Sequence, residues 1–146
     1  MQIHFISSQK IALSKVADII FLNQKIDLSP EVRENIKSCR SYLDKKINRE
    51  EDPIYGINTG FGSLCNVKIS SDKLVKLQEN LIMSHACGIG EIVPNSIVKL
   101  MLFLKIQSLS YGHSGVQLKT VERLIHFFNN DILPIIYTQG SLGASG

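Results

Sequence analysis

The stretch from residue 97 to residue 109 constrains the fold of this chain more than any other part of the sequence. Its apolar side chains would cover almost the whole circumference of a helix: Ile97, Val98, Leu100, Met101, Leu102, Phe103, Leu104, Ile106 and Leu109. A helix that is apolar on every side must be buried by other helices or by another subunit. Lys99 and Lys105 interrupt the run, which falls short of the roughly 18–20 apolar residues of a membrane span. The sequence therefore predicts a buried helix with more apolar surface than the neighbouring segments of this chain can cover. No membrane partner is expected.

Apolar residues recur at helical spacing in four further segments, which predicts a mainly α fold. Ser29 followed by Pro30 is a typical helix start, because the serine hydroxyl caps and the proline has no amide hydrogen to leave unpaired. The expected helices cover residues 9–22 with Ser7 or Ser8 as the cap, residues 30–47, residues 72 to about 88 with Leu74, Leu77, Leu81 and His85 facing inward, and residues 118–130. Residues 3–6 are a candidate strand, and the three glycines within residues 54–62 predict a loop.

Composition excludes several classes of protein. The chain has 146 residues, 44% hydrophobic and 20% charged, with a formal net charge of +3, so it is not a disordered or collagen-like chain. Its charges are scattered, with no arginine stripe between aromatic residues, and no nucleic-acid partner is expected. Three cysteines without C-x-x-C spacing argue against a disulfide framework and a structural zinc site. The first ten residues lack the pattern of a secretory signal, so we expect a cytoplasmic protein with reduced thiols.

Two glycine-rich segments are candidates for chemical motifs. Gly56, Gly60 and Gly62 fit neither a dinucleotide-binding motif nor a P-loop. Residues 143–146 (GASG) are one residue too short for the nucleophile elbow of a hydrolase. A serine hydrolase nevertheless stays a formal alternative. Small residues around Ser145 would let the Gly146 nitrogen approach the Ala144 carbonyl carbon. Cyclisation and water loss there would create an electron-poor methylene group.

Three strings, in this order, resemble the aromatic amino acid ammonia-lyases. They are YGINTGFG (residues 55–62), LQENL with SHACG (residues 77–81 and 84–88) and GSLGASG (residues 140–146). The stretches LSPEV (residues 28–32) and LSYGHSGV (residues 109–116) agree as well, so the resemblance covers nearly the whole chain. Its closest match lies among the histidine-specific members of the family.

The resemblance implies a fold and an assembly. Residues 1–146 would be the N-terminal portion of a larger subunit, ending at the Ala144-Ser145-Gly146 triad, with the remainder outside this sequence. The fold would be the N-terminal part of the ammonia-lyase/fumarase-like helical fold, with short strands and glycine-rich active-site loops. Family members are homotetramers, and an oligomer would supply partners for the apolar helix.

The resemblance also implies a cofactor and roles for individual residues. Ala144, Ser145 and Gly146 would form 4-methylideneimidazole-5-one (MIO), without a metal or an external cofactor. In the family, this group captures the substrate amine or, in a rival proposal, the aromatic ring. Tyr55 would be the base that removes the β-proton. His85, Ser84 and Gly62 would bind the substrate, with His85 hydrogen-bonded to its ring substituent.

The implied reaction is elimination of ammonia from an aromatic L-amino acid. The preferred prediction is conversion of L-histidine to trans-urocanate. Ser84 and His85 resemble the histidine-specific members, but some tyrosine ammonia-lyases carry the same pair. Gln139 and Tyr111 depart from the commonest histidine-specific pattern. A tyrosine or phenylalanine ammonia-lyase, or an aminomutase on the same scaffold, is the alternative. A non-enzymatic helical interaction domain is the third possibility.

Overall fold

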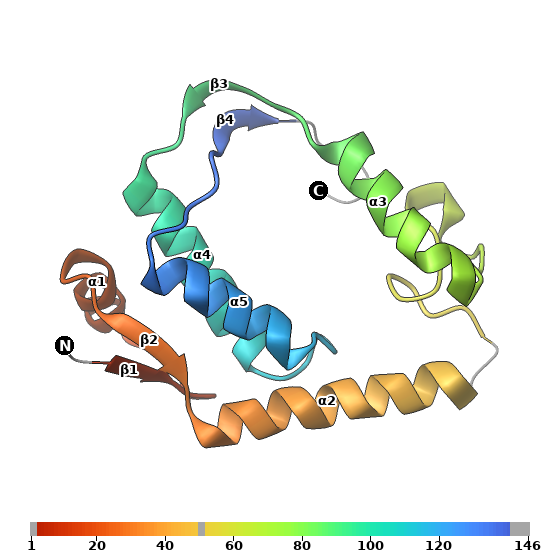
Figure 1. Ribbon diagram of the computed structural model, residues 1–146, viewed down its shortest axis with the longest axis horizontal. Coiled ribbons are helices and arrows are strands. Elements are labelled where there is room, and N and C mark those ends of the chain that lie inside the picture. Colours follow the sequence, from red (N-terminus) through yellow and green to blue (C-terminus); the bar gives the residue numbers. More distant parts are fainter. Residues whose placement is uncertain (1–2, 50–51, 141–146) are drawn as a thin grey trace. The chain divides into compact units, whose positions relative to one another are not determined.

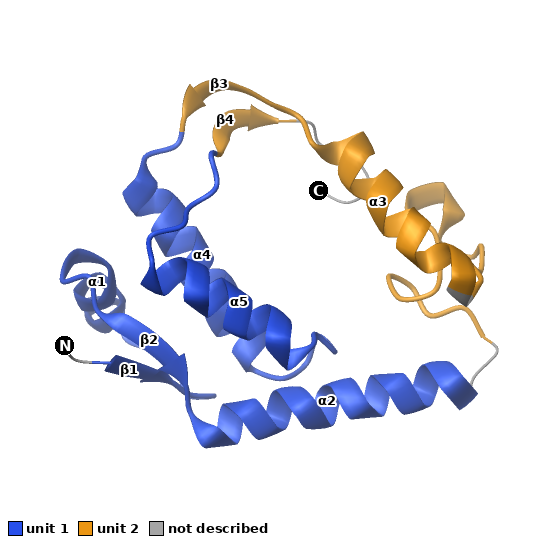
Figure 2. Ribbon diagram, viewed as in Figure 1, with its two compact units in different colours: residues 1–49, 93–135 blue, residues 50–92, 136–146 orange. Residues whose placement is uncertain are grey.

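The computed structural model describes residues 3–49 and 52–140, and this part of the chain is mainly helical, as predicted (Figure 1). Its elements are β1 (Ile3–Ile6), α1 (Leu13–Phe21), β2 (Lys25–Leu28), α2 (Pro30–Arg49), η1 (Gly62–Leu64), η2 (Ser71–Lys73), α3 (Leu74–His85), β3 (Gly88–Ile92), α4 (Asn95–Ser110), α5 (Leu118–Asn129) and β4 (Tyr137–Gly140). They divide into two compact units, coloured separately in Figure 2. Within the described residues, unit 1 comprises 3–49 and 93–135, and unit 2 comprises 52–92 and 136–140.

Helix α4 lies in the core of unit 1. Val98, Phe103 and Ile106 are buried, and the Phe103 ring packs on Phe128 of α5 with centroids 6.1 Å apart. On the same helix Ile97, Met101 and Leu104 stay 48%, 46% and 49% exposed. The neighbours of α4 in the described part of unit 1 therefore cover only part of its apolar surface, as the sequence predicts. The buried core comprises Ile6, Val16, Ile19, Ile26, Leu28, Val32, Ile36, Phe103, Ile106, Val121, Ile125 and Phe128.

Lys99 is buried within α4 rather than a polar interruption at its surface. Its Nζ atom donates to Asn23 Oδ1 and, at 2.5 Å, to Asp131 Oδ1. It also lies 5.0 Å from the centre of the Phe128 ring. Asn23 and Asp131 have φ values of +50° and +53°, which non-glycine residues rarely adopt. One buried ammonium group thus holds the left-handed residues that follow α1 and α5.

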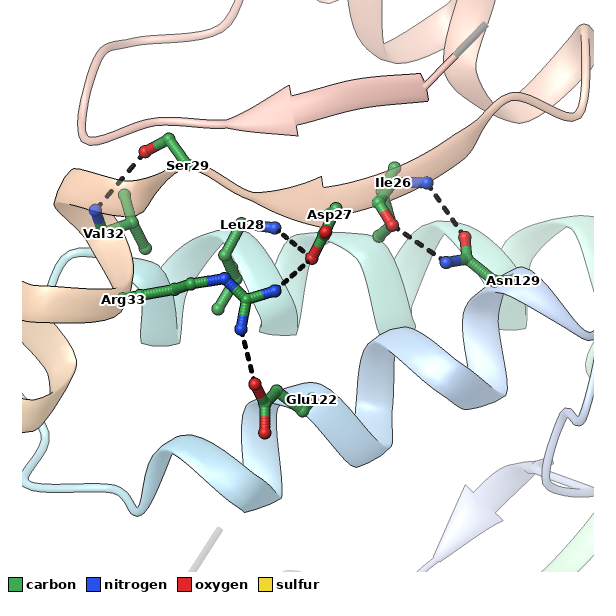
Figure 3. Close-up of polar contacts among 8 residues, drawn as sticks. All are labelled: Ile26, Asp27, Leu28, Ser29, Val32, Arg33, Glu122 and Asn129. Atoms are coloured by element: carbon green, nitrogen blue, oxygen red, sulfur yellow. Dashed lines mark hydrogen bonds and ion pairs between the residues drawn. The ribbon is translucent and has the colours of Figure 1, made fainter. Parts of the chain in front are cut away.

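Strand β2 pairs in parallel with β1, with Ile3 opposite Lys25 and Ile6 opposite Leu28. The Asn129 side chain of α5 occupies the other edge of β2: its Oδ1 accepts from Ile26 N at 2.9 Å and its Nδ2 donates to Ile26 O at 2.8 Å (Figure 3). An amide side chain therefore replaces a neighbouring strand at this edge. Strand β2 was not expected from the sequence.

Helix α2 begins at Pro30, as predicted, whereas the predicted start of α1 is wrong. Ser29 Oγ accepts from Val32 N at 3.3 Å, directly before Pro30 (Figure 3). Helix α1 begins at Leu13, four residues later than expected, and has no side-chain cap. The reason is that Ser7 Oγ accepts locally from Gln9 N, while the Ser8 hydroxyl donates to Glu31.

In strand β1, burial lowers the pKa of His4 below its ordinary value of 6.5, and the positive charge of Lys15 lowers it further.

None of the helices in residues 3–49 and 52–140 is long and apolar enough to cross a membrane.

Candidate active site

Tyr55 lies in a tight turn of unit 2. The Ile54 carbonyl oxygen closes the turn by accepting from Ile57 N at 3.0 Å and from Asn58 N at 3.2 Å. Gly56 follows Tyr55 with a φ of +75°, a left-handed conformation that favours glycine. The Tyr55 side chain is 59% exposed, and its ring meets the Phe61 ring edge-on with centroids 6.0 Å apart. The turn therefore presents the phenol to solvent instead of packing it into a core.

The segment after the turn is held by a short antiparallel contact. Ile69 N donates to Asn58 O at 2.7 Å, Gly60 N donates to Val67 O at 3.1 Å, and Thr59 forms a β-bridge with Lys68. At Gly60 a Cβ atom would lie only 2.6 Å from Leu64 Cβ, so a larger residue would displace the turn that follows. The loop expected at residues 54–62 is thus an ordered segment without helix or strand up to η1.

Gly62, which the resemblance assigns to substrate binding, is the first residue of η1 and has a φ of +59°. A side chain there would be strained in this backbone conformation. Its glycine identity is therefore explained by the backbone.

Ser84 and His85 end helix α3 and share hydrogen bonds with the Leu81 carbonyl oxygen. Ser84 Oγ donates to Leu81 O at 3.0 Å, and His85 Nδ1 lies 2.9 Å from both Leu81 O and Ser84 Oγ. A carbonyl oxygen can only accept, so the contact favours the tautomer with the proton on Nδ1. In that tautomer Nε2 is the acceptor nitrogen of the ring.

The structure corrects the expected orientation of His85. The side chains of Leu74, Leu77 and Leu81 are half-buried, whereas His85 is exposed. His85 is the last residue of α3, and its imidazole turns to the polar carbonyl of the preceding turn. His85 is therefore an exposed residue at the end of α3 and not part of its packed face.

Residues of the glycine-containing segment and of α3 together line a hollow of about 270 Å³ in unit 2. Its lining comprises Gly60, Phe61, Leu64, Leu77, Asn80, Leu81 and Ser84. The first and second motifs therefore lie against each other within this unit. Of the expected site residues, Ser84 lines the hollow, whereas Tyr55, Gly62 and His85 are not among its lining residues.

Strands β3 and β4 join the second motif to the segment that leads into the third. They pair antiparallel, with Gly88 opposite Gly140 and Ile89 opposite Gln139. At Gly140 a Cβ atom would lie 3.4 Å from the Cys87 carbonyl oxygen, which is ordinary van der Waals contact with the residue just before β3. Ala144, Ser145 and Gly146 lie outside the described residues. Ala144 follows Gly140 by four positions along the chain, a reach of at most about 14 Å.

A larger hollow, of about 380 Å³, lies in unit 1 and is lined by residues that include Arg33, Glu122 and His126. Three of its charged groups, Asp27, Arg33 and Glu122, already serve structural contacts. Arg33 Nη2 bonds Asp27 Oδ1 at 2.6 Å and its Nη1 bonds Glu122 Oε1 at 2.5 Å (Figure 3). None of the expected site residues within residues 3–49 and 52–140 lines it.

Fold and sequence comparisons agree on the class of protein. The structure of a histidine ammonia-lyase from Trypanosoma cruzi superimposes on 97% of this chain and covers 27% of the solved chain, with a TM-score of 0.80 and 30% identity. A phenylalanine aminomutase of Pantoea agglomerans covers 96% of the chain and 27% of its own, with a TM-score of 0.87 and 31% identity. The mainly helical fold is thus that of the ammonia-lyase structures.

The family model described as aromatic amino acid lyase matches residues 11–146, and the chain belongs to this family. A curated histidine ammonia-lyase of Deinococcus radiodurans is 43% identical over 141 residues, which is 97% of this chain and 27% of the relative. The chain therefore spans just over a quarter of the length of that relative.

Three polar residues at this site were not expected from the sequence. Asn58 and Thr59 are buried beside Tyr55, and Asn80 lines the hollow. The signal for Asn58 and Thr59 was present, because asparagine and threonine side chains often bond to the backbone of nearby turns.

Proposed function

We propose that this protein is an MIO-dependent ammonia-lyase that converts L-histidine to trans-urocanate and ammonia. The observation that carries the proposal is the pairing of Gly88 with Gly140, which brings the strand leading to the Ala144-Ser145-Gly146 triad beside the end of α3. Because the chain spans 27% of its Deinococcus relative, the activity is proposed for a larger subunit of which residues 1–146 are the N-terminal portion.

The prosthetic group would come from the chain itself. Ammonia is eliminated from a carbon whose neighbouring hydrogen is scarcely acidic, and protein side chains offer bases and nucleophiles but no strong carbon electrophile. MIO, which this family uses, supplies such an electrophile. Ala144, Ser145 and Gly146 are the proposed precursors, with no metal and no external cofactor. The pairing of Gly88 with Gly140 supports this, because it places the strand that precedes the triad beside the segment that follows α3.

Tyr55 is the proposed base, and its phenol oxygen would take the β-proton of the substrate. Its exposure and its position on a turn with left-handed Gly56 support this role, since a base must reach the substrate directly. The Phe61 ring, at 6.0 Å, limits the directions in which the Tyr55 ring can turn.

His85 is the proposed contact to the substrate ring. With Nδ1 held by Leu81 O, its Nε2 atom accepts a hydrogen bond, so the matching ring carries an N–H or an O–H group. Imidazole and phenol rings satisfy this condition, and an unsubstituted phenyl ring does not. Ser84 would orient His85, and the backbone at Gly62 would bind the substrate.

A tyrosine or phenylalanine ammonia-lyase, or an aminomutase, is the alternative. The aminomutase from Pantoea agglomerans supports it through a TM-score of 0.87, and an acceptor at His85 also suits the tyrosine hydroxyl. A homotetramer in the cytoplasm completes the proposal. The half-exposed Ile97, Met101 and Leu104 of α4 support an assembly that covers them.

Incubation of the full-length polypeptide with L-histidine or L-tyrosine tests the proposal. The products, urocanate and coumarate, absorb at different ultraviolet wavelengths. We expect urocanate and free ammonia from L-histidine. Product from L-tyrosine alone would contradict the histidine assignment, and a β-amino acid in place of ammonia would identify an aminomutase.

A further inference from the structure

Two buried polar side chains next to Tyr55 have no part in the function proposed above. Asn58 is 5% exposed and Thr59 is 1% exposed, in a loop whose other polar residues face solvent or pair through the backbone. Burial of a polar side chain is unfavourable unless it forms hydrogen bonds. Their partners therefore indicate what the two residues hold in place.

Asn58 holds the residue before Tyr55. Its Oδ1 atom accepts from Ile54 N at 2.6 Å, while its own backbone N–H donates to Ile54 O at 3.2 Å. Its Nδ2 atom also reaches Asp52 O at 3.4 Å. Both polar backbone groups of Ile54 are thus bonded to one asparagine, and this fixes the peptide that enters Tyr55.

Thr59 holds the residue after Tyr55. Its Oγ1 atom accepts from Gly56 N at 3.3 Å and donates to Gly60 O at 2.9 Å. The glycine at position 56 has no Cβ to restrict its backbone, and no atom lies within 4 Å of where a Cβ would be. The Thr59 hydroxyl therefore supplies a restraint that the residue following Tyr55 lacks.

We propose that Asn58 and Thr59 are positioning residues for Tyr55: their buried side chains bond the backbone on either side of it and set where its exposed phenol points. The inference rests on the proposed role of Tyr55 as the base. Neither residue touches the substrate. Proton transfer needs the base within hydrogen-bond reach, and a displacement of about 1 Å can lower a rate on the order of 100-fold.

A matched set of Thr59 variants tests this role in the full-length polypeptide, with whichever of L-histidine and L-tyrosine is turned over. Thr59→Val keeps the branched shape and removes the hydroxyl, and Thr59→Ser keeps the hydroxyl. Thr120→Val makes the same change at an exposed threonine of α5. Each kcat is divided by the folded fraction from circular dichroism and by the prosthetic-group content from mass spectrometry.

For Thr59→Val we expect kcat to fall by about 10- to 100-fold with KM nearly unchanged, because substrate contacts remain while the base is misplaced. Thr59→Ser should recover most of that loss, and Thr120→Val should behave as the wild type. An unchanged kcat per folded site in Thr59→Val, or no recovery in Thr59→Ser, would overturn the inference.

Two further variants keep the outcome decisive. If Thr59→Val does not fold, Asn58→Ala takes its place, with the same expected fall in kcat and the same contrary result. Tyr55→Phe separates the two levels of the proposal. If Tyr55→Phe is inactive while Thr59→Val and Asn58→Ala are fully active, only the positioning role is wrong. If Tyr55→Phe keeps the wild-type rate, the assignment of Tyr55 as the base fails, and this inference fails with it.

Discussion

Leu81, Ser84 and His85 form a closed set of hydrogen bonds at the end of α3, and this set decides which atom the imidazole presents. The Leu81 carbonyl accepts from Ser84 Oγ at 3.0 Å and faces His85 Nδ1 at 2.9 Å. Two acceptors would repel each other at that distance, which is why the proton belongs on Nδ1. The selectivity of the proposed enzyme for a donor-bearing ring then follows from one backbone carbonyl.

His85→Phe should therefore lower kcat/KM for the substrate whose ring donates a hydrogen bond. We expect a loss of about 10- to 100-fold, the equivalent of one hydrogen bond to a buried ligand group. Steady-state kinetics with L-histidine and L-tyrosine measures it, and His113→Phe, at an exposed histidine of unit 1, is the control. Unchanged kcat/KM in His85→Phe would contradict the proposed ring contact.

The sequence motifs were sufficient to select Tyr55, Ser84 and His85 as candidate site residues. They were not sufficient to predict the hydrogen bonds that fix the position of these residues. The contact of Thr59 with Gly56 N depends on a turn geometry that no spacing rule encodes. The orientation of His85 was predicted wrongly, because helical periodicity assigns a face without regard to where the helix ends. At Ala144, Ser145 and Gly146 the motif remains a prediction.

At the scale of elements, the helices and strand β1 were predictable, whereas β2, β3 and β4 were not. The apolar periodicity of α2 and α5 is local, and both helices occur where expected. Strand β2 pairs with β1, and β3 pairs with β4 some fifty residues away along the chain on the register of Gly88 with Gly140. Every residue of β3 and β4 is exposed, so neither strand has the alternation of buried and exposed residues that is typical of a half-buried strand.

Asn129 should stabilise unit 1 by completing the edge of β2. Asn129→Ala leaves the N–H and C=O of Ile26 without these partners, and we expect the free energy of unfolding to fall by about 1–3 kcal/mol. Urea denaturation followed by circular dichroism measures the change. Asn48→Ala, at an exposed asparagine of α2, should stay within about 0.5 kcal/mol of the wild type. Equal stability of the two variants would show that the edge contact contributes nothing.

At the scale of the whole molecule, the chain divides into two units that are each discontinuous in sequence. Unit 1 holds the buried core, whereas unit 2 holds the first two motifs and the strand that leads to the third. Length and composition alone gave no sign of this division. The apolar circumference of α4 did predict that unit 1 would leave part of that helix uncovered, and Ile97, Met101 and Leu104 are the uncovered part.

The central claim is that Ala144, Ser145 and Gly146 form the electrophile of an ammonia-lyase. Mass spectrometry of the full-length polypeptide, intact and after proteolysis, tests it most directly. We expect a loss of about two water molecules, one from cyclisation and one from dehydration of Ser145, confined to the peptide that contains the triad, and no such double loss in Ser145→Ala. An unmodified triad in wild-type protein of full ammonia-lyase activity would contradict it.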